Sequence, residues 1–516
     1  MLLKHKENFI IPFIYQSTYE EVCKQIKDDN YFSKIDELKE TELHAFINRR
    51  FWQEENGHCE IYRVNANRGR DALVSLYDTK QDTDIHISDI RFYIFKSGIM
   101  FTVISAEYTR GAQGLSVDAV EEINAALKDL YTHKNRFLLF DKNLKLTQKL
   151  DAKVFENHYG YLTKCNVPDD MGKQKIMLTS VVKSKDEILV EAEVELFRDK
   201  QTGAFIDFED GFFAPVKNKA SMIKCYRQGD YSLADIVQTV NSHLGILFSD
   251  YFSGSSNTAL PKKAVVFNMH VVKKKDTADL REHLFHLAHG YSHSYKCPKE
   301  EGHIVSAFDN SYWNVTREGV ANINMVDEAD GDKFLLQYFD GKFDSVYLWI
   351  YLLVLHQYYG LQYFTCKLLK VYQESLIIER NDTKKEYHKL LGQMEEIKNN
   401  GDLFLLEYTF ADISQISHQN DIYAHISEVY NIKGLIEDYS TNAEICDKIL
   451  AKKQQKALQK KVNFIAAVTT FFTLFTSVTQ TVMGLFELGG TFSFVLRVLL
   501  GIAGIGLVVI GLMKNK

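Results

Sequence analysis

Apolar and polar residues alternate over most of the first two thirds of the chain in ways that predict strands and amphipathic helices. Two β-rich runs in residues 90–105 are separated by Lys96-Ser97-Gly98, which is typical of a hairpin turn. Further strand-like runs occupy residues 137–140, 188–196 and 264–272, and helical patterns occupy residues 117–130 and 280–289. We therefore expect residues 1–335 to form a mixed α/β region, which we interpret as a sensor domain on the cytosolic side of a membrane.

The pattern becomes helical from about residue 343. Residues 345–366 contain no Asp, Glu, Lys or Arg, but His356, Gln357 and Gln362 would make a poor lipid-facing surface, so we expect a buried helix. A polar helix is expected at residues 379–399 and a longer one at 421–461. Apolar residues of the longer helix recur at spacings of three and four, which predicts packing against partner helices. Residues 336–461 are therefore interpreted as a helical region that ends in a stalk helix.

Two apolar segments follow at the C-terminal end of the sequence. Residues 462–486 carry no charged side chain, and residues 491–513 carry only Arg497. At about 1.5 Å of rise per residue, each helix would exceed the roughly 30 Å hydrocarbon core of a bilayer. The sequence thus predicts a transmembrane hairpin after the α/β domain and the stalk. Lysines flank the hairpin on both sides, which places both termini in the cytoplasm and the protein in the cell inner membrane.

Polar and small residues gather on one side of the first predicted span. They are Asn463, Thr470, Thr473, Ser477, Gln480 and Gly484. One interpretation is that this side packs against the glycine-rich second span, since small residues allow close approach of helices. The other is that it lines an aqueous pore at the axis of an oligomer, with Glu487 at the pore mouth.

The order of these parts resembles the CorA family of divalent-cation channels. In that family the outer end of the first span carries Gly-Met-Asn, commonly followed by Phe-Glu. The corresponding residues here are Met483-Gly484-Leu485-Phe486-Glu487, in which the asparagine is missing. The resemblance covers residues 421–516 well and the remainder in outline.

The resemblance implies a homopentameric funnel in which the first spans line the pore and Mg²⁺ is a permeant or bound ion. The large N-terminal region is similar to a divergent branch of CorA-like proteins encoded beside type III CRISPR systems. That similarity implies gating by a nucleotide signal in antiviral defence.

Histidines form the most conspicuous cluster in the N-terminal region. The segment REHLFHLAHGYSH contains His283, His286, His289 and His293. On a helix the last three would share a face, which suits a metal ion or an anionic ligand. Gly290 is expected to end that helix, and the alternative is a set of exposed or packed histidines.

A second candidate ligand site is the segment SYWNVTREG at residues 311–319. Trp313 could stack on a base and Arg317 could pair with a phosphate. The same segment is equally consistent with a strand and a turn.

Composition narrows the classes of function. The net charge of −7 argues against direct DNA or RNA binding, which usually needs a basic surface. The seven cysteines show no CxxC pair, and the N-terminal apolar run is too short for a signal peptide. Because no phosphate-binding, hydrolase or metalloprotease motif occurs, we do not expect an enzyme.

These observations favour a homo-oligomeric, CorA-like channel or membrane-permeabilising effector that is gated by its N-terminal domain. Two alternatives stay open at this point. One is a membrane-tethered sensor or binding module whose hairpin only anchors and oligomerises it, and the other is a housekeeping magnesium transporter.

Overall fold

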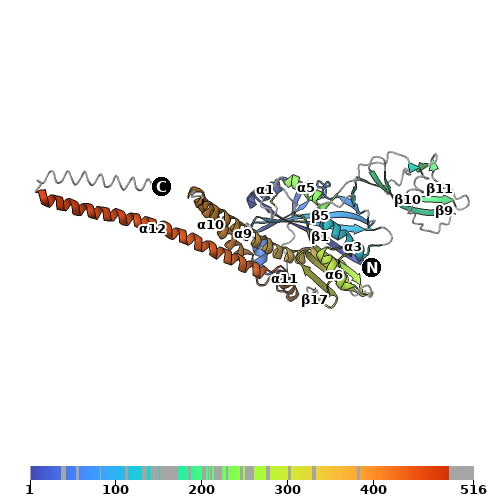
Figure 1. Cartoon of the computed structure of the whole chain (residues 1–516). Helices are drawn as coiled ribbons and strands as arrows, with labels where there is room; N and C mark the ends of the chain where they lie inside the picture. The colour runs from blue at the N-terminus through green and yellow to red at the C-terminus, as the bar shows by residue number, and fades with distance from the viewer. Residues whose placement is uncertain are drawn as a thin grey trace. The chain divides into compact units, whose positions relative to one another are not determined.

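A computed structural model describes most of the chain (Figure 1). The described residues are 2–35, 42–53, 57–78, 80–81, 83–110, 114–130, 136–140, 231–244, 261–274, 279–299, 304–327, 333–380 and 384–486, together with separate strand segments between residues 150 and 249. By their contacts, residues group into two compact units. Unit 1 consists of Met1–Tyr363 and Leu403–Ile436, and unit 2 of Phe364–Asp402 and Glu437–Lys516. The sequence prediction had instead divided the chain into three consecutive segments, 1–335, 336–461 and 462–516.

Sixteen of the described strands form one mixed sheet. Their order is β11-β10-β14-β7-β4-β5-β6-β1-β16-β19-β18-β17, with β2, β3, β9 and β15 paired off this path. The strands of the main path are β1 (Leu2–Tyr15), β4 (Ser75–Asp78), β5 (Thr83–Phe95), β6 (Ile99–Thr109), β7 (Phe137–Phe140), β10 (Ile188–Asp199), β11 (Phe205–Ile206), β14 (Ile223–Arg227), β16 (Val265–Lys273), β17 (Ile304–Phe308), β18 (Ser311–Thr316) and β19 (Gly319–Val326). The strands off the path are β2 (Phe32–Lys34), β3 (Cys59–Val64), β9 (Lys173–Lys183) and β15 (Phe248–Ser249). A separate small sheet contains β8 (Leu150–Asp151), β12 (Phe208–Glu209) and β13 (Phe212–Phe213).

Several strands lie where the alternating pattern predicted them. β5 and β6 pair as an antiparallel hairpin, and Gly98 in its turn has a φ of 92°, a conformation that side chains with a Cβ rarely adopt. The strand expected at 264–272 is β16, and it pairs in parallel with β19. The two central strands β1 and β16 are buried along most of their length because helices cover both faces of the sheet.

One face of the central strands is covered by α3 (Val117–Lys128) and α6 (Leu280–His289). Strand side chains hold α6 through hydrogen bonds: Asn314 Nδ2 donates to the Leu284 carbonyl at 3.2 Å, and Thr316 Oγ1 donates to the Ala288 carbonyl at 3.1 Å. α3 also contacts α6 directly, so the two helices lie side by side on this face (Figure 1). The sheet thereby fixes both helices that carry the candidate site.

The opposite face packs against η5 (Phe343–Tyr347) and the first part of α9 (Leu348–Arg380). The ring of Phe267 on β16 stacks on Phe343 with centroids 4.2 Å apart. His356 is buried and lies 2.7 Å from the Ser97 hydroxyl, and Gln357 donates to the Tyr408 carbonyl at 2.7 Å. These polar partners explain how residues 345–366 are accommodated in a folded core, as the sequence predicted.

The remaining helices are α1 (Tyr19–Asp28), α2 (Ala45–Asn48), η2 (Arg49–Gln53), α5 (Leu233–Leu244), α7 (Lys333–Gln337), α8 (Phe339–Lys342), α10 (Lys384–Tyr408), α11 (Ser417–Val429) and α12 (Ile432–Phe486). The single helix predicted at 421–461 is divided between α11 and α12. Asn431 has a φ of 52° and interrupts the helical path between them. Within unit 2, Tyr439 on α12 donates to the Lys398 carbonyl of α10 at 2.9 Å.

The predicted transmembrane hairpin is wrong on the described part of the chain. Among the helices up to Phe486, none combines the length and the apolarity needed to cross a bilayer. The prediction relied on the absence of charge in residues 462–486, whereas amide and hydroxyl side chains recur along this part of α12 and lower its apolarity. The predicted fold class with its membrane hairpin and the predicted multi-pass placement in the inner membrane are corrected accordingly. The second predicted span, 491–513, lies outside the described residues.

Candidate metal centre

Glu121 is the central residue of a histidine and carboxylate cluster in unit 1. It lies in the second turn of α3, whose N-terminus is capped by Ser116, which accepts a hydrogen bond from the Ala119 amide at 3.2 Å. The Glu121 side chain is fully buried between α3 and α6. A buried carboxylate is unfavourable unless it is paired, so its partners decide its role.

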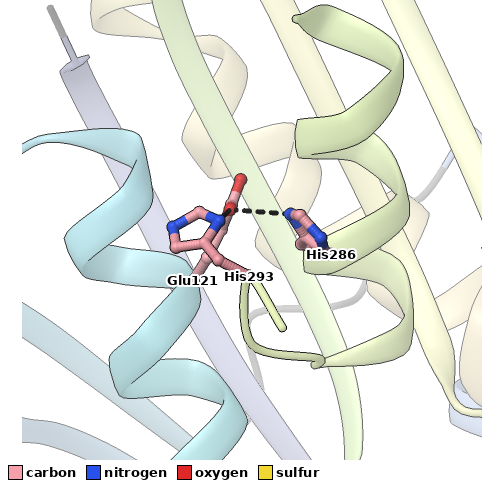
Figure 2. A group of neighbouring side chains, drawn as sticks. All are labelled: Glu121, His286 and His293. Carbon is pink, nitrogen blue, oxygen red and sulfur yellow. Dashed lines mark hydrogen bonds and ion pairs between the residues drawn. The ribbon is translucent and has the colours of Figure 1, made fainter. Parts of the chain in front are cut away.

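Three histidines supply those partners. His283 and His286 are three residues apart on α6 and therefore point to the same side of the helix. Gly290 ends α6 in the left-handed conformation with a φ of 57°, which turns the chain back and returns His293 to the cluster. Figure 2 shows Glu121 facing His286, with the ring of His293 beside them.

The two carboxylate oxygens of Glu121 face different histidines. Oε1 lies 2.7 Å from His283 Nδ1, whereas Oε2 lies 3.1 Å from His286 Nδ1 and 3.4 Å from His293 Nδ1. Asp118, one turn earlier on α3, has its Oδ1 3.9 Å from His283 Nδ1 and 3.9 Å from His293 Nε2. The side chains of His286, His283 and His293 are 2%, 19% and 41% exposed, so the cluster runs from the interior to the surface.

Further hydrogen bonds orient the side chain of His286 and hold the segment that carries His293. His286 Nε2 donates to the Tyr295 carbonyl at 2.7 Å, because a carbonyl oxygen can only accept. This leaves Nδ1 as the nitrogen that faces Glu121. The backbone amide of His293 donates to Glu122 Oε1 at 3.0 Å, which holds the returning segment against α3. Such outer hydrogen bonds orient the ligands in metal sites built from histidine.

The cluster favours charged forms of its members. Burial alone would raise the pKa of Glu121, but hydrogen bonds and charge from His283 and His286 lower it below its usual value. Burial opposes the positive charge of His283 and His286, yet contact with Glu121 raises the pKa of both. In the metal-free protein, this contact favours protonated histidines beside an ionised carboxylate.

His289 does not join this cluster. Although His289 is three residues from His286 on α6, its Nδ1 lies 2.9 Å from Glu318 Oε2. Lys128 Nζ lies 3.5 Å from Glu318 Oε1, and these partners lower the pKa of Glu318 to about 2 despite its partial burial. The structure thus brings together His283, His286 and His293, and it separates His289 from them.

Trp313 and Arg317 do not form a shared ligand surface. The Trp313 ring is buried on β18 and lies 5.0 Å from the Tyr347 ring, so its faces are packed by protein. Arg317 lies just before the start of β19, and its Nε donates to the Val429 carbonyl at 3.3 Å. The strand and turn interpretation of this segment agrees with these positions.

The residues proposed to line a pore lie on the last turns of α12. Hydroxyl groups of Thr470, Thr473 and Ser477 donate to carbonyl oxygens four residues earlier at 2.8–2.9 Å. Asn463 and Gln480 are exposed, and Gly484 is the next member of the set along the helix. Glu487 lies outside the described residues. That this set lines a pore stays a prediction.

The ligand types in the cluster indicate a particular class of ion. Glu121, His286 and His293 offer ligand atoms that lie within 4.8 Å of one another, and so do Asp118, Glu121 and His283. Imidazole nitrogen with carboxylate oxygen suits Zn²⁺ and neighbouring divalent transition metals, whereas Mg²⁺ prefers oxygen ligands in an octahedral arrangement. Mg²⁺, the permeant or bound ion that the family resemblance implies, is therefore a poor match to this cluster.

Sequence reasoning found the histidines but missed the carboxylates. Asp118, Glu121 and Glu122 lie in a helical pattern about 160 residues earlier, and each is typical of a solvated helix surface. No local signal distinguished Glu121, because its neighbours one turn away on the helix are a mixture of apolar and polar residues: Val117, Asp118, Asn124 and Ala125. No family model, curated protein or solved structure matches this chain.

The pKa shifts predict opposite pH dependences with and without metal. In the metal-free protein, the raised pKa values of His283 and His286 contribute stability that is complete below about pH 6.5 and is lost as the pH rises through these pKa values. The lowered pKa of Glu121 contributes stability that is lost as the pH falls below about 4.5. Metal binding requires deprotonated histidines. Saturating Zn²⁺ should therefore raise the melting temperature more at about pH 8 than at about pH 5.5, as measured by calorimetry. An equal increase at both pH values would contradict this.

Proposed function

We propose that this protein is a metal-responsive binding module that takes up a divalent transition-metal ion of the Zn²⁺ type. The observation that carries this proposal is the convergence of Glu121, His286 and His293 from α3, α6 and the segment after α6. Two imidazole nitrogens and one carboxylate oxygen form a three-residue ligand set that leaves a fourth position for water or another ligand.

The arrangement also explains how binding could be sensed. His293 and the carbonyl of Tyr295 both lie in the segment that follows Gly290, and both contact the cluster. A metal ion bound to His286 and His293 would connect this segment to α6 and, through Glu121, to α3. Occupancy of the site would then change how firmly the segment is held, which is the physical requirement for a metal-dependent response.

Calorimetric titration of the full chain tests this function. After removal of metals with a chelator, Zn²⁺ should bind saturably and much more tightly than Mg²⁺. His293→Ala should weaken Zn²⁺ binding by about tenfold or more, since it removes a ligand from an exposed part of the site without opening the core. His289→Gln is the matched control, because His289 lies on the same helix but outside the cluster, and it should bind like the wild type.

Two results would contradict the proposal. One is the absence of saturable Zn²⁺ binding to the wild-type chain. The other is an equal loss of affinity in His289→Gln and His293→Ala, which would mean that binding depends on α6 in general and not on the cluster.

The channel and magnesium-transporter hypotheses required the transmembrane hairpin, and we do not propose them further. Gating by a nucleotide and assembly into a homo-oligomer stay predictions. Exposed apolar side chains at Leu458, Val462 and Ile465, spaced by four and three residues on α12, favour self-association.

A further inference from the structure

We propose that the cluster binds two metal ions and that Glu121 bridges them, an inference that rests on the proposed metal-binding function. The starting observation is that the two oxygens of Glu121 point to two different ligand sets. Oε2 faces His286 and His293, whereas Oε1 faces His283. A carboxylate that gives one oxygen to each of two ions is the usual way in which paired metal sites share a ligand.

The first ion would bind His286, His293 and Glu121 Oε2. Two ligand atoms that bind one ion at about 2.0–2.2 Å in tetrahedral geometry lie about 3.3–3.6 Å from each other. The observed separations from Oε2, 3.1 Å to His286 Nδ1 and 3.4 Å to His293 Nδ1, come within a few tenths of an ångström of these values. These two separations therefore need only small adjustments to hold the ion.

The second ion would bind His283, Asp118 and Glu121 Oε1. Here His283 Nδ1 lies 2.7 Å from Oε1 and 3.9 Å from Asp118 Oδ1, so the first separation must lengthen and the second must shorten. His283 and Asp118 are at the exposed side of the cluster, where side chains can adjust at small cost. The second ligand set contains one nitrogen and two oxygens, whereas the first contains two nitrogens and one oxygen. In the sense of hard and soft ligands, the second set is therefore the harder one.

The charges around the cluster fit two ions better than one. Glu121 alone could balance only part of the charge of one divalent ion, but Asp118 and Glu122 lie on the same helix and also face the cluster. These carboxylates would supply the counter-charges of the bound metal ions.

The stoichiometry of Zn²⁺ bound to the full chain tests this inference separately from the proposed function. We expect two ions per wild-type chain by elemental analysis after dialysis, and one ion in His283→Ala, because the inner ligand set stays intact. His289→Gln should retain two. In protein loaded with Mn²⁺, electron paramagnetic resonance should show a spin-coupled pair that disappears in His283→Ala, whereas ions at unrelated surface sites would show no coupling.

Each alternative result has a distinct meaning. One ion in both the wild type and His283→Ala would overturn the two-ion inference and leave the proposed function standing. Two ions in both proteins would also overturn it, since the second ion would then lie elsewhere. No bound ion in the wild type would overturn the proposed function itself.

Discussion

Replacing Glu121 by Gln is expected to lower the affinity for Zn²⁺ by about 100-fold or more, the largest effect on binding that we predict. Glu121 supplies the only fully buried carboxylate of the cluster, and loss of even an outer partner of a metal ligand typically costs about 10-fold to 100-fold. The amide has nearly the same shape, so the substitution removes the charge with little change in packing. Competition with a chromophoric chelator measures the affinity over this range.

Glu122→Gln is the matched control for this variant. Glu122 is the next residue of α3, and its contact with the cluster is a hydrogen bond from the His293 amide, which a glutamine oxygen can still accept. We expect a much smaller loss of affinity in Glu122→Gln than in Glu121→Gln. Equal affinities in the wild type and Glu121→Gln, with both proteins folded by circular dichroism, would contradict the role given to Glu121.

Replacing Asp78 by Ala should destabilise unit 1 by about 3–5 kcal/mol, because it leaves a buried guanidinium unpaired. Asp78 is fully buried, and Arg136 Nε lies 3.2 Å and 3.1 Å from its two oxygens while Nη2 lies 2.9 Å from Oδ2. Arg136 Nη2 also donates to the Glu122 carbonyl at 2.8 Å. The ion pair therefore holds the part of α3 that carries Glu121.

Urea denaturation of the metal-free chain, followed by circular dichroism, measures this effect. The double variant Asp78→Leu with Arg136→Met should be much more stable than Asp78→Ala, because no unpaired charge remains in the core. If Asp78→Ala unfolded at the same urea concentration as the wild type, the pair would not support α3 in the way described.

Local patterns in the sequence were sufficient for the elements that carry the histidines. The alternating run at β16, the helix at α6 and the glycine that ends it were all predicted, because each depends on residues close together in the chain. The pairing of His283 with Glu121 could not be predicted, since the two residues are 162 positions apart and meet only when α3 and α6 pack on the same face of the sheet. The same packing separates His289 from its neighbours on α6.

The errors near the C-terminal end have a related cause. Apolar spacing continues smoothly through residues 421–461, but the left-handed conformation of Asn431 ends one helix and begins another. The membrane span at residues 462–486 was predicted from the absence of charged side chains. Hydroxyl and amide side chains are frequent on this part of α12, and none of the described helices is long and apolar enough to span a membrane. A pattern that divides residues only into apolar and polar does not show the backbone conformation of one residue. It also does not show how apolar a segment is.

Anomalous diffraction from a crystal of the full chain soaked in Zn²⁺ tests the central claim most directly. We predict a zinc peak between α3 and α6, about 2.0–2.2 Å from His286 Nδ1 and from Glu121 Oε2, with His293 as a further ligand. The same peak should be missing in Glu121→Gln crystals soaked in the same way. A map with zinc only at other surface positions, and with His286 still hydrogen-bonded directly to Glu121, would contradict the account.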